Sequence, residues 1–500
     1  MRRWLLCEEC VHGELDSLRS PSRRDRVVPM LAKAIRGLSV GQRANLRRQL
    51  EETYQQLANR ATAQHRALPV THEGYIGHFL SNYEAVYQSR AVSGLAAIGT
   101  PEAQEALREA AEEARDGALI VRGDVLEELS TAISNTVPGG TVAWASISAG
   151  PLHTCGIRTD GRSYCWGRND KGQLGDGTID IRLRPTLVAG NLTFSSIATG
   201  SGGGDHTCGL AADSVYCWGS NGRGQLGNGT TTPRKVPTLV AGDIAFSGVT
   251  VGGDHTCAWT AAHQAYCWGD NHAGQVGDGT TADRHQPVAS THGMRLRSMR
   301  AGTFHTCADS LNGRLYCWGA NGEGQLGDGS TIDRPAPTPA ATSLRFKSIS
   351  MGGLHGCGLI RGGSASVDGL AYCTGQNQDG RLGDGSLIGR DSLVPVKGDH
   401  RFLTISAGEG HTCGIVSGTR ELRCWGDNSY GQLGDGTSNP RQVPTKVLGS
   451  QSYAVVSAGA GHTCAITTLG TAYCWGRNTD GQVGDSTNTD RAIPTEVMTP

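Results

Sequence analysis

The chain has 500 residues, a formal net charge of −1 and 73 glycines, which is about twice the usual ~7%. A chain of this length can bury a large core without metals or disulfides, and its neutral charge argues against sequence-independent nucleic-acid binding, which needs a positive field. No run of ~18 apolar residues predicts a membrane span, and the apolar part of MRRWLL is too short for a signal peptide.

Residues 1–136 have the composition of helices, because Ala, Leu, Glu and Arg dominate and glycine is uncommon. Apolar residues at steps of three and four predict an amphipathic helix over residues 38–68. A Thr-Pro start predicts a second helix over residues 98–114. Residues 89–113, SRAVSGLAAIGTPEAQEALREAAEE, resemble a HEAT-type helical hairpin, which implies a protein-contact surface. The first part of the chain is therefore expected to be an α-helical, HEAT-like domain.

Two further features of this first part suggest partners. Cys7, Cys10 and His12 form CEECVH, which is half of a structural zinc site. No second half follows nearby, so this is the one weak metal candidate, with a local disulfide or plain thiols as alternatives. The basic run over residues 19–48 could contact nucleic acid or an acidic partner, but a solvated helix face is the favoured interpretation.

After residue 136 the chain repeats one motif seven times. A His-Thr-Cys element, written His-Gly-Cys in the fifth copy, begins at His153, His206, His255, His305, His355, His411 and His462. A period near fifty residues with many turn signals favours a propeller, because one small sheet cannot bury both its faces while a closed ring of sheets can. We expect a mainly β protein, in which residues 137–500 form a seven-bladed β-propeller behind the N-terminal α-helical domain.

Each copy contains four strand-like pieces, as a propeller blade requires. We take the Pro-x-x-Val piece as the first, followed by segments such as FSSIATG (194–200), HTCGI and YCWG. The first copy then lacks a clear Pro-x-x-Val piece, and the chain ends with a surplus PTEV at 494–497. This predicts that strand 494–497 pairs into the first blade and closes the ring, which would remove exposed sheet edges. The competing segment is TVPGG at 136–140, whose glycines disfavour a strand.

The repeat resembles the regulator of chromosome condensation family, whose signature is a His-Thr/Ser element followed by Trp-Gly, an Asn and Gly-Gln-Leu-Gly. HTCGLAADSVYCWGSNGRGQLGNGT (206–230) is a full copy, and the resemblance covers residues from about 142 to 498. It implies the propeller fold. It says less about function, because similar propellers serve as nucleotide-exchange factors, chromatin binders, photoreceptors, ligase accessory domains and secreted inhibitors.

Residues present in nearly every copy are better explained by the blade than by a site. The seven His are expected to be buried and to hydrogen-bond backbone, and the Trp of CWG to fill the space between blades. The Asp of the GDGT motif, such as Asp176, could suggest calcium, but one carboxylate beside glycines does not supply six to eight oxygens. We therefore expect a turn braced by an Asp–Arg pair, with Arg182 or Arg184 as the partner in the first copy.

The cysteines also repeat in pairs, and a three-residue turn would place Cys155 opposite Cys165 on one face of a hairpin. We expect seven disulfides, with free buried thiols as the alternative. The pairs are Cys155–Cys165, Cys208–Cys217, Cys257–Cys267, Cys307–Cys317, Cys357–Cys373, Cys413–Cys424 and Cys464–Cys474. Disulfides indicate an extracellular, periplasmic or cell-surface protein, and cysteine-rich members of this family resemble exported bacterial proteins. A cytoplasmic location is the alternative, because no signal peptide is visible.

We expect a non-enzymatic, exported, disulfide-braced module that binds an unidentified protein through variable loops. One alternative is a guanine-nucleotide exchange factor or regulator of a small GTPase, and another is an enzyme with a site on a propeller rim. No nucleophile elbow, phosphate loop or acid pair rises above the repeat, so no catalytic residue or cofactor is expected. The partner-binding candidates lie where copies depart from the repeat: Trp259, His285, His292, Arg361 and Asp368.

Overall fold

The computed structural model describes residues 40–63, scattered residues between 71 and 110, and residues 143–500 except 291–293 and 363–366. The chain divides into two compact units, residues 1–142 and 143–500, so the division falls slightly after the expected boundary at 136. Among the described residues, no helix is both long and apolar enough to cross a membrane.

The N-terminal unit contains the predicted first helix, α3 (Val40–Ala63). Its Leu50 packs with Ile76 and Leu80 in a small apolar core. Within the second predicted helix, Leu107 is helical and buried. The zinc candidate Cys7, Cys10 and His12, both ends of the predicted helix (38–39 and 64–68) and most of the HEAT-like stretch lie outside the described residues.

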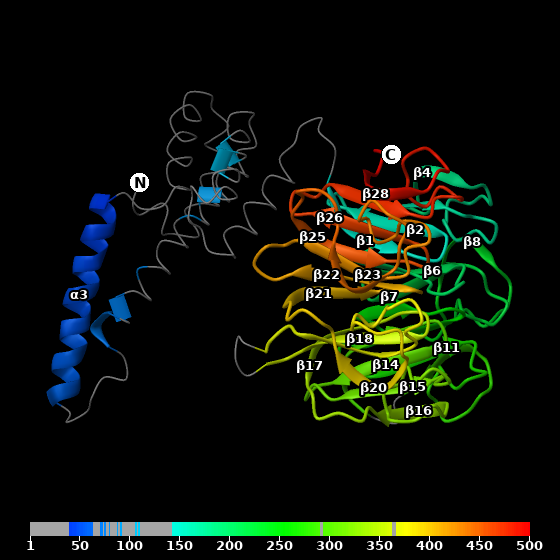
Figure 1. Ribbon diagram of the computed structural model, residues 1–500, viewed down its shortest axis with the longest axis horizontal. Coiled ribbons are helices and arrows are strands. Elements are labelled where there is room, and N and C mark those ends of the chain that lie inside the picture. The colour runs from blue at the N-terminus through cyan, green and yellow to red at the C-terminus, as the bar shows by residue number, and fades with distance from the viewer. Residues whose placement is uncertain are drawn as a thin grey trace. The chain divides into compact units, whose positions relative to one another are not determined.

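The second unit is a seven-bladed propeller, as predicted (Figure 1). Each blade is a four-stranded antiparallel sheet whose strands pair in chain order. The blades are β1 (Trp144–Ala149), β2 (His153–Arg158), β3 (Ser163–Gly167) and β4 (Arg182–Leu187); β5 (Ser196–Thr199), β6 (His206–Ala211), β7 (Ser214–Gly219) and β8 (Arg234–Leu239); β9 (Gly248–Val251), β10 (His255–Trp259), β11 (Ala265–Gly269) and β12 (Arg284–Ala289); β13 (Leu296–Ala301), β14 (His305–Ser310), β15 (Leu315–Gly319) and β16 (Arg334–Pro339); β17 (Phe346–Met351), β18 (His355–Ile360), β19 (Ala371–Gly375) and β20 (Arg390–Pro395); β21 (Phe402–Ala407), β22 (His411–Val416), β23 (Leu422–Gly426) and β24 (Arg441–Lys446); and β25 (Tyr453–Ala458), β26 (His462–Thr467), β27 (Ala472–Gly476) and β28 (Arg491–Glu496).

The four strands of a blade differ in burial according to their distance from the axis. The first strands, β1, β5, β9, β13, β17, β21 and β25, contact one another around the ring and form its inner wall. The second strands, which begin with the repeated His, are almost fully buried. The fourth strands are the outer edges, and there Pro185 and its equivalents are tolerated because an edge strand does not need every N–H for pairing.

The glycine that ends each third strand is required by its backbone. Gly167 has φ +102°, a left-handed conformation that side chains rarely adopt. A Cβ at this position would also lie 2.6 Å from Leu152 O, on the loop between β1 and β2. The Trp-Gly of six copies therefore combines a buried ring with a turn that only glycine can make, and the fifth copy keeps the glycine after Thr374.

The predicted closure of the ring was wrong. Residues 494–496 lie in β28, which pairs with β27 of its own blade, where Cys474 faces Thr495. The first blade already has its outer strand, β4, which contains the Pro-x-x-Val piece that follows YCWG. This piece is the last strand of each blade rather than the first, so the apparent deficit in the first copy and the surplus in the last both disappear.

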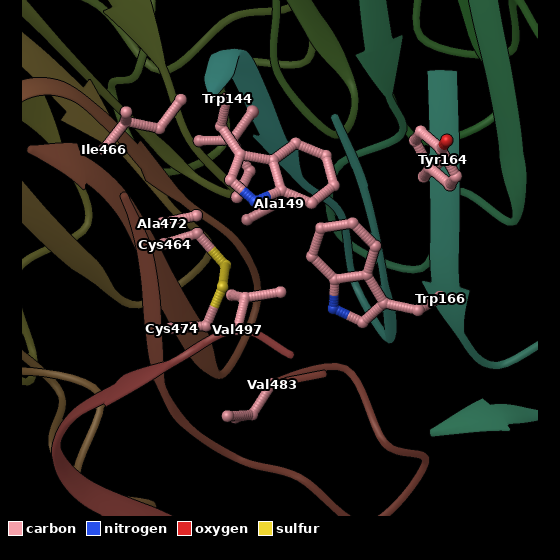
Figure 2. Packing of buried hydrophobic residues seen from close by; sticks show 11 residues of the cluster. Trp144, Ala149, Tyr164, Trp166, Cys464, Ile466, Ala472, Cys474, Val483 and Val497 are labelled. Carbon is pink, nitrogen blue, oxygen red and sulfur yellow. A yellow bond between two sulfur atoms is a disulfide. The ribbon is translucent and has the colours of Figure 1, made fainter. Parts of the chain in front are cut away.

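The ring closes instead by packing between the last and first blades, and Figure 1 shows β25 and β26 beside β1. Trp144 and Trp166 of the first blade share a buried cluster with Val483 and Val497 of the last. Figure 2 shows both indole rings next to these valines and the Cys464–Cys474 disulfide. Trp144 N also donates to Gly470 O at 2.8 Å.

Candidate functional site

The repeated His, Thr, Trp and Gln link neighbouring blades. His153 Nε2 lies 2.9 Å from Thr207 Oγ1 in the next blade, and the Thr207 hydroxyl donates to Gln173 O at 2.9 Å. Trp218 Nε1 donates to the same carbonyl at 2.9 Å. The equivalent His–Thr bonds join His206 to Thr256, His255 to Thr306, His355 to Thr412, His411 to Thr463 and His462 to Thr154. These residues are scaffold, as the sequence predicted, but the partner of each bonded His is a Thr hydroxyl of the next blade rather than the predicted backbone group.

Burial keeps the seven histidines neutral. It lowers the pKa to about 3 for His153, His206, His255 and His462, to about 4 for His305 and His411, and well below 6.5 for His355. Within the described part of the chain, no three His, Cys, Asp or Glu side chains gather as a metal site.

The interface between the fourth and fifth blades departs from this pattern. Its Thr is replaced by Gly356, so His305 Nε2 has no partner although His305 is fully buried. Met351 fills the space, since a Cβ on Gly356 would lie 2.7 Å from its Sδ. The Trp is replaced by Thr374, whose hydroxyl donates to Gly324 O at 2.9 Å. The fifth blade thus keeps its fold with fewer polar links to the fourth.

The GDGT motif forms the predicted turn, and Arg182, rather than Arg184, is the partner. Arg182 Nε donates to Asp176 Oδ2 at 2.8 Å. Burial raises the pKa of Asp176, but hydrogen bonds from Thr178 and Arg182 outweigh it and the pKa lies below its usual value. Equivalent pairs are Arg284–Asp278, Arg334–Asp328, Arg390–Asp384, Arg441–Asp435 and Arg491–Asp485. In the second copy Asn228 replaces the Asp, and the buried Arg234 Nε has no partner.

The structure brings together all fourteen predicted cysteines and joins each pair as a disulfide. Cys155 lies directly opposite Cys165 in the β2–β3 register, with the Cα atoms 4.1 Å apart. This short separation is typical of a non-hydrogen-bonded antiparallel pair, which the hairpin argument required. The Cys357–Cys373 pair keeps the same register despite the longer connection between β18 and β19.

A cavity of about 630 Å³ lies at one mouth of the ring. Because strands alternate in direction, the loops after the first and third strands of every blade meet at the same end. The loops 302–304, 352–354, 408–410 and 459–461 follow inner strands and line the cavity, together with the residues after β19, β23 and β27. The cavity therefore sits over the axis and is built mainly from the fourth to seventh blades.

Arg381 is the most unusual residue of this cavity. It stands where the other six copies have Gln, such as Gln325, and its side chain is only 6% exposed. Its guanidinium forms an ion pair with Asp379, and Nη1 donates to Glu409 O at 3.1 Å. Nε is buried without a partner. Arg381 O still accepts the hydrogen bonds from Trp425 and Thr412, so the backbone keeps its scaffold role. The Arg381 side chain, in contrast, lines the cavity.

The other side chains at the mouth of the ring are polar, and they differ from one blade to the next. The guanidinium of Arg477 lies 5.2 Å from the ring centre of Tyr430, a cation–π arrangement. Asp427 accepts hydrogen bonds from Ser429 and Gln432, and the Glu409 side chain is exposed. The residues that line the cavity in the described chain include no Ser, Cys, Lys or His. The cavity can bind polar and aromatic groups. Its side chains of nucleophilic type are Thr303, Tyr430 and the carboxylates of Glu409 and Asp427, and the lining that the structure describes includes no His or Lys to activate them.

Of the partner-binding candidates that the structure describes, Trp259, His285, Arg361 and Asp368, none lines this cavity. The Trp259 ring packs over Gly248 and against the core between the third and fourth blades, which is a structural position. His285 is exposed on the outer strand β12. Arg361 and Asp368 lie on the β18–β19 connection, at the opposite end of the blade, where Asp368 pairs with Lys347 at 2.7 Å. His292 lies outside the described residues.

The residues that sequence reasoning missed had a detectable signal. Aligning the seven copies shows Arg381 as the one replacement of the repeated Gln. Tyr430, Arg477 and Glu409 occupy positions that vary from copy to copy, and only the topology shows that these positions converge on the axis.

Comparison with known proteins identifies the repeat. The family described as regulator of chromosome condensation (RCC1) repeat matches residues 160–210, 212–259, 263–308, 312–359, 368–415, 423–466 and 470–500. The human E3 ubiquitin-protein ligase HERC2 is 36% identical over 118 residues, which are 23% of this chain and 2% of that protein. The ultraviolet-B receptor UVR8 of Arabidopsis thaliana is 36% identical over 106 residues, which are 20% of this chain and 24% of the receptor.

Two solved structures share the fold. Human WBSCR16 has a TM-score of 0.60 at 19% identity, covering 68% of this chain and 94% of the other. Yeast RCC1 (Prp20), solved bound to Kap60, has a TM-score of 0.58 at 21% identity, covering 70% of this chain and 85% of the other. At these identities the likeness concerns the fold alone.

Proposed function

The chain belongs to the regulator of chromosome condensation repeat family, and from this premise we propose that its propeller is a non-catalytic protein-binding module whose partner docks on the axial mouth. The observation that carries the proposal is the asymmetry of that mouth. Arg381 interrupts a sixfold-repeated Gln at the cavity, and the Tyr430–Arg477 pair stands beside it. Arg and Tyr are the residue types that contribute most to protein interfaces when they are partly buried.

Catalysis is less well supported by this site. The polar groups of the mouth are two guanidinium groups, two carboxylates and amide or hydroxyl groups, without a nucleophile beside a base. The relative HERC2 carries the name of a ligase, but the matched residues are 2% of its length. A role as a small-GTPase regulator remains the second functional class, and it is distinguished from the first by an exchange assay with purified GTPases.

The mouth can be tested by affinity capture with the full-length chain. We compare wild type with Arg381→Gln, which restores the repeat residue, and with a Tyr430→Ala/Arg477→Ala double variant. His285→Ala, on the outer strand and away from the mouth, is the matched control. Proteins of the source organism that bind wild type and the control should be lost from both mouth variants. Equal recovery by all four proteins would contradict docking on the mouth.

We further propose that the protein works in an oxidising compartment with the seven blade disulfides formed. The support is that seven pairs of cysteines keep one register opposite each other, including the pair with the longest connection. Alkylation of the natively produced protein without reductant should leave all fourteen propeller cysteines unmodified, followed by full labelling after reduction. Labelling of all fourteen without reductant would contradict the exported assignment and favour an intracellular role.

A further inference from the structure

One position of the inner wall is occupied by a hydroxyl in most blades. The counterparts of Ser148 are Ala198, Thr250, Arg300, Ser350, Ser406 and Ser457. In five blades this hydroxyl accepts a hydrogen bond from a backbone N–H of the next inner strand, as Ser350 Oγ does from Ala407 N at 2.9 Å. The other four bonds are Ser148 from Thr199, Thr250 from Ala301, Ser406 from Ala458 and Ser457 from Ala149. The position therefore ties neighbouring blades together at the axis.

Arg300 breaks this pattern in the fourth blade. Its side chain is exposed, while the hydroxyl residues at the same position are buried or half-buried. Arg300 Nη1 donates to Met299 O at 2.8 Å, and within the described residues Met351 of the fifth blade makes no bond equivalent to that of Ala407. Although Arg300 as a residue is exposed, burial of its guanidinium by the surrounding protein lowers its pKa, and the charge of Asp309 only partly opposes this. Both properties fit a side chain on the wall of an axial channel.

The charge of Arg300 has no carboxylate partner in the described part of the chain. The other cations of the inner strands are paired, since Arg297 binds Asp309 and Lys347 binds Asp368. None of the seven inner strands contains Asp or Glu. An arginine on a wall without acids presents to the channel a positive charge that the charge of Asp309 offsets only in part.

The wall around Arg300 also offers hydrogen-bond donors. On the two adjoining inner strands, the hydroxyls of Thr250 and Ser350 accept from backbone N–H groups, and each keeps its own proton to donate. Ser406 and Ser457 do the same farther round the ring. A cation combined with several O–H donors and no carboxylate selects a ligand that accepts hydrogen bonds and carries negative charge. Arg300 lies three residues before Thr303, which lines the mouth cavity, so a ligand can approach from that end.

We propose that Arg300 and the neighbouring wall hydroxyls form an axial binding site for a small oxyanion, namely a phosphate or carboxylate group. The site is separate from the protein-docking residues of the mouth, and it explains why the fourth blade gives up a link to the fifth that five other blades keep. The planar guanidinium can bind two oxygens of such a group at once.

The test uses inorganic phosphate and the full-length chain at constant ionic strength, set with chloride. Thermal unfolding of wild type should shift upward by about 2–4 °C as phosphate is titrated to saturation. Arg300→Ser restores the repeat hydroxyl and should lose this shift while unfolding at the same or a higher temperature without phosphate. Arg314→Ser, which removes an exposed arginine on the β14–β15 hairpin of the same blade, is the control and should respond as wild type does.

Isothermal titration with phosphate provides an independent readout, with one site expected in wild type and in Arg314→Ser and none in Arg300→Ser. Acetate in place of phosphate distinguishes a carboxylate-selective site from one that prefers phosphate. The proposal is overturned if neither anion shifts wild type, or if Arg300→Ser keeps the full response, which would place anion binding elsewhere. Both outcomes are independent of whether the mouth binds a protein partner.

Discussion

Exchanging Met351 and Gly356 for the residues of the other blades tests how the blades are linked. In the Met351→Ala/Gly356→Thr variant, the new Thr hydroxyl should meet His305 Nε2 as Thr412 meets His355, at 2.8 Å. It should also donate to Gln325 O, which lies 3.9 Å from the Cβ position of residue 356. The double variant would therefore give the buried His305 its missing partner.

The magnitudes follow from the contacts. Met351→Ala alone removes a buried side chain from the core and should cost about 2–5 kcal/mol. Gly356→Thr alone pushes against Met351 Sδ, 2.7 Å from the new Cβ, and should cost about 1–3 kcal/mol. In the double variant the clash is gone and two buried hydrogen bonds form, at ~1 kcal/mol each. Relief of the clash and the two bonds together should make the double about 3–5 kcal/mol more stable than the sum of the singles.

The assay is urea unfolding of wild type, both singles and the double, followed by tryptophan fluorescence and far-ultraviolet circular dichroism. Free energies are compared only where the two probes coincide, since a multi-blade ring can unfold in stages. The reverse substitutions, Ala407→Met and Thr412→Gly, serve as a control at the interface of the fifth and sixth blades. There Thr412→Gly alone should be destabilising, because it removes the hydrogen-bond partner of the buried His355. Additive costs at residues 351 and 356 would refute the account of this interface.

Three further changes have defined outcomes. Lowering the pH from 6.5 to 4 should destabilise the fold, because the seven buried histidines stay neutral while those of the unfolded chain, with pKa near 6.5, take up protons. Each histidine contributes up to about 1.4 kcal/mol per pH unit to this loss of stability. A thermal midpoint that does not fall across this pH window would contradict the prediction. Ser486→Gly should stabilise by about 1 kcal/mol in chemical denaturation, because Ser486 has φ +66° where Gly177 stands in the first copy, and a loss of stability would show that its side chain is needed. Asn228→Asp should add about 0.5–1 kcal/mol by giving Arg234 the carboxylate that Asp435 supplies to Arg441, and no gain in chemical denaturation would contradict this.

Much of the fold could be predicted because repetition reports the architecture directly. Seven His-Thr-Cys elements gave seven blades, and the spacing of Cys155 and Cys165 predicted their register. The predicted order of strands within a blade was wrong, because the sequence of a cyclic repeat does not show at which strand a blade begins. The placement of Pro-x-x-Val as last strand is fixed by pairing, such as Arg182 opposite Gly167, which the sequence does not report.

The candidate site was harder to predict for a different physical reason. A departure from the repeat is visible in the sequence, but its meaning depends on where the varied position points. Trp259 departs from the repeat and packs into the core, whereas Arg381 departs from it at the axial mouth. Positions on the loops after the first and third strands converge on one point only when seven blades are arranged in a ring, so the mouth is a property of the assembly rather than of any copy.

The correction at the chain termini also changes where the ring is expected to be weakest. A strand exchanged between the last and first blades would be needed only if their interface were poorly linked. That interface has the full set of bonds, since Thr154 meets His462 at 2.8 Å and both Thr154 and Trp166 donate to Gln482 O. The interface that lacks these bonds lies between the fourth and fifth blades, where Gly356 and Thr374 replace the repeated Thr and Trp. Opening of the ring should therefore begin in the middle of the sequence rather than at its ends, next to the blade that carries Arg381.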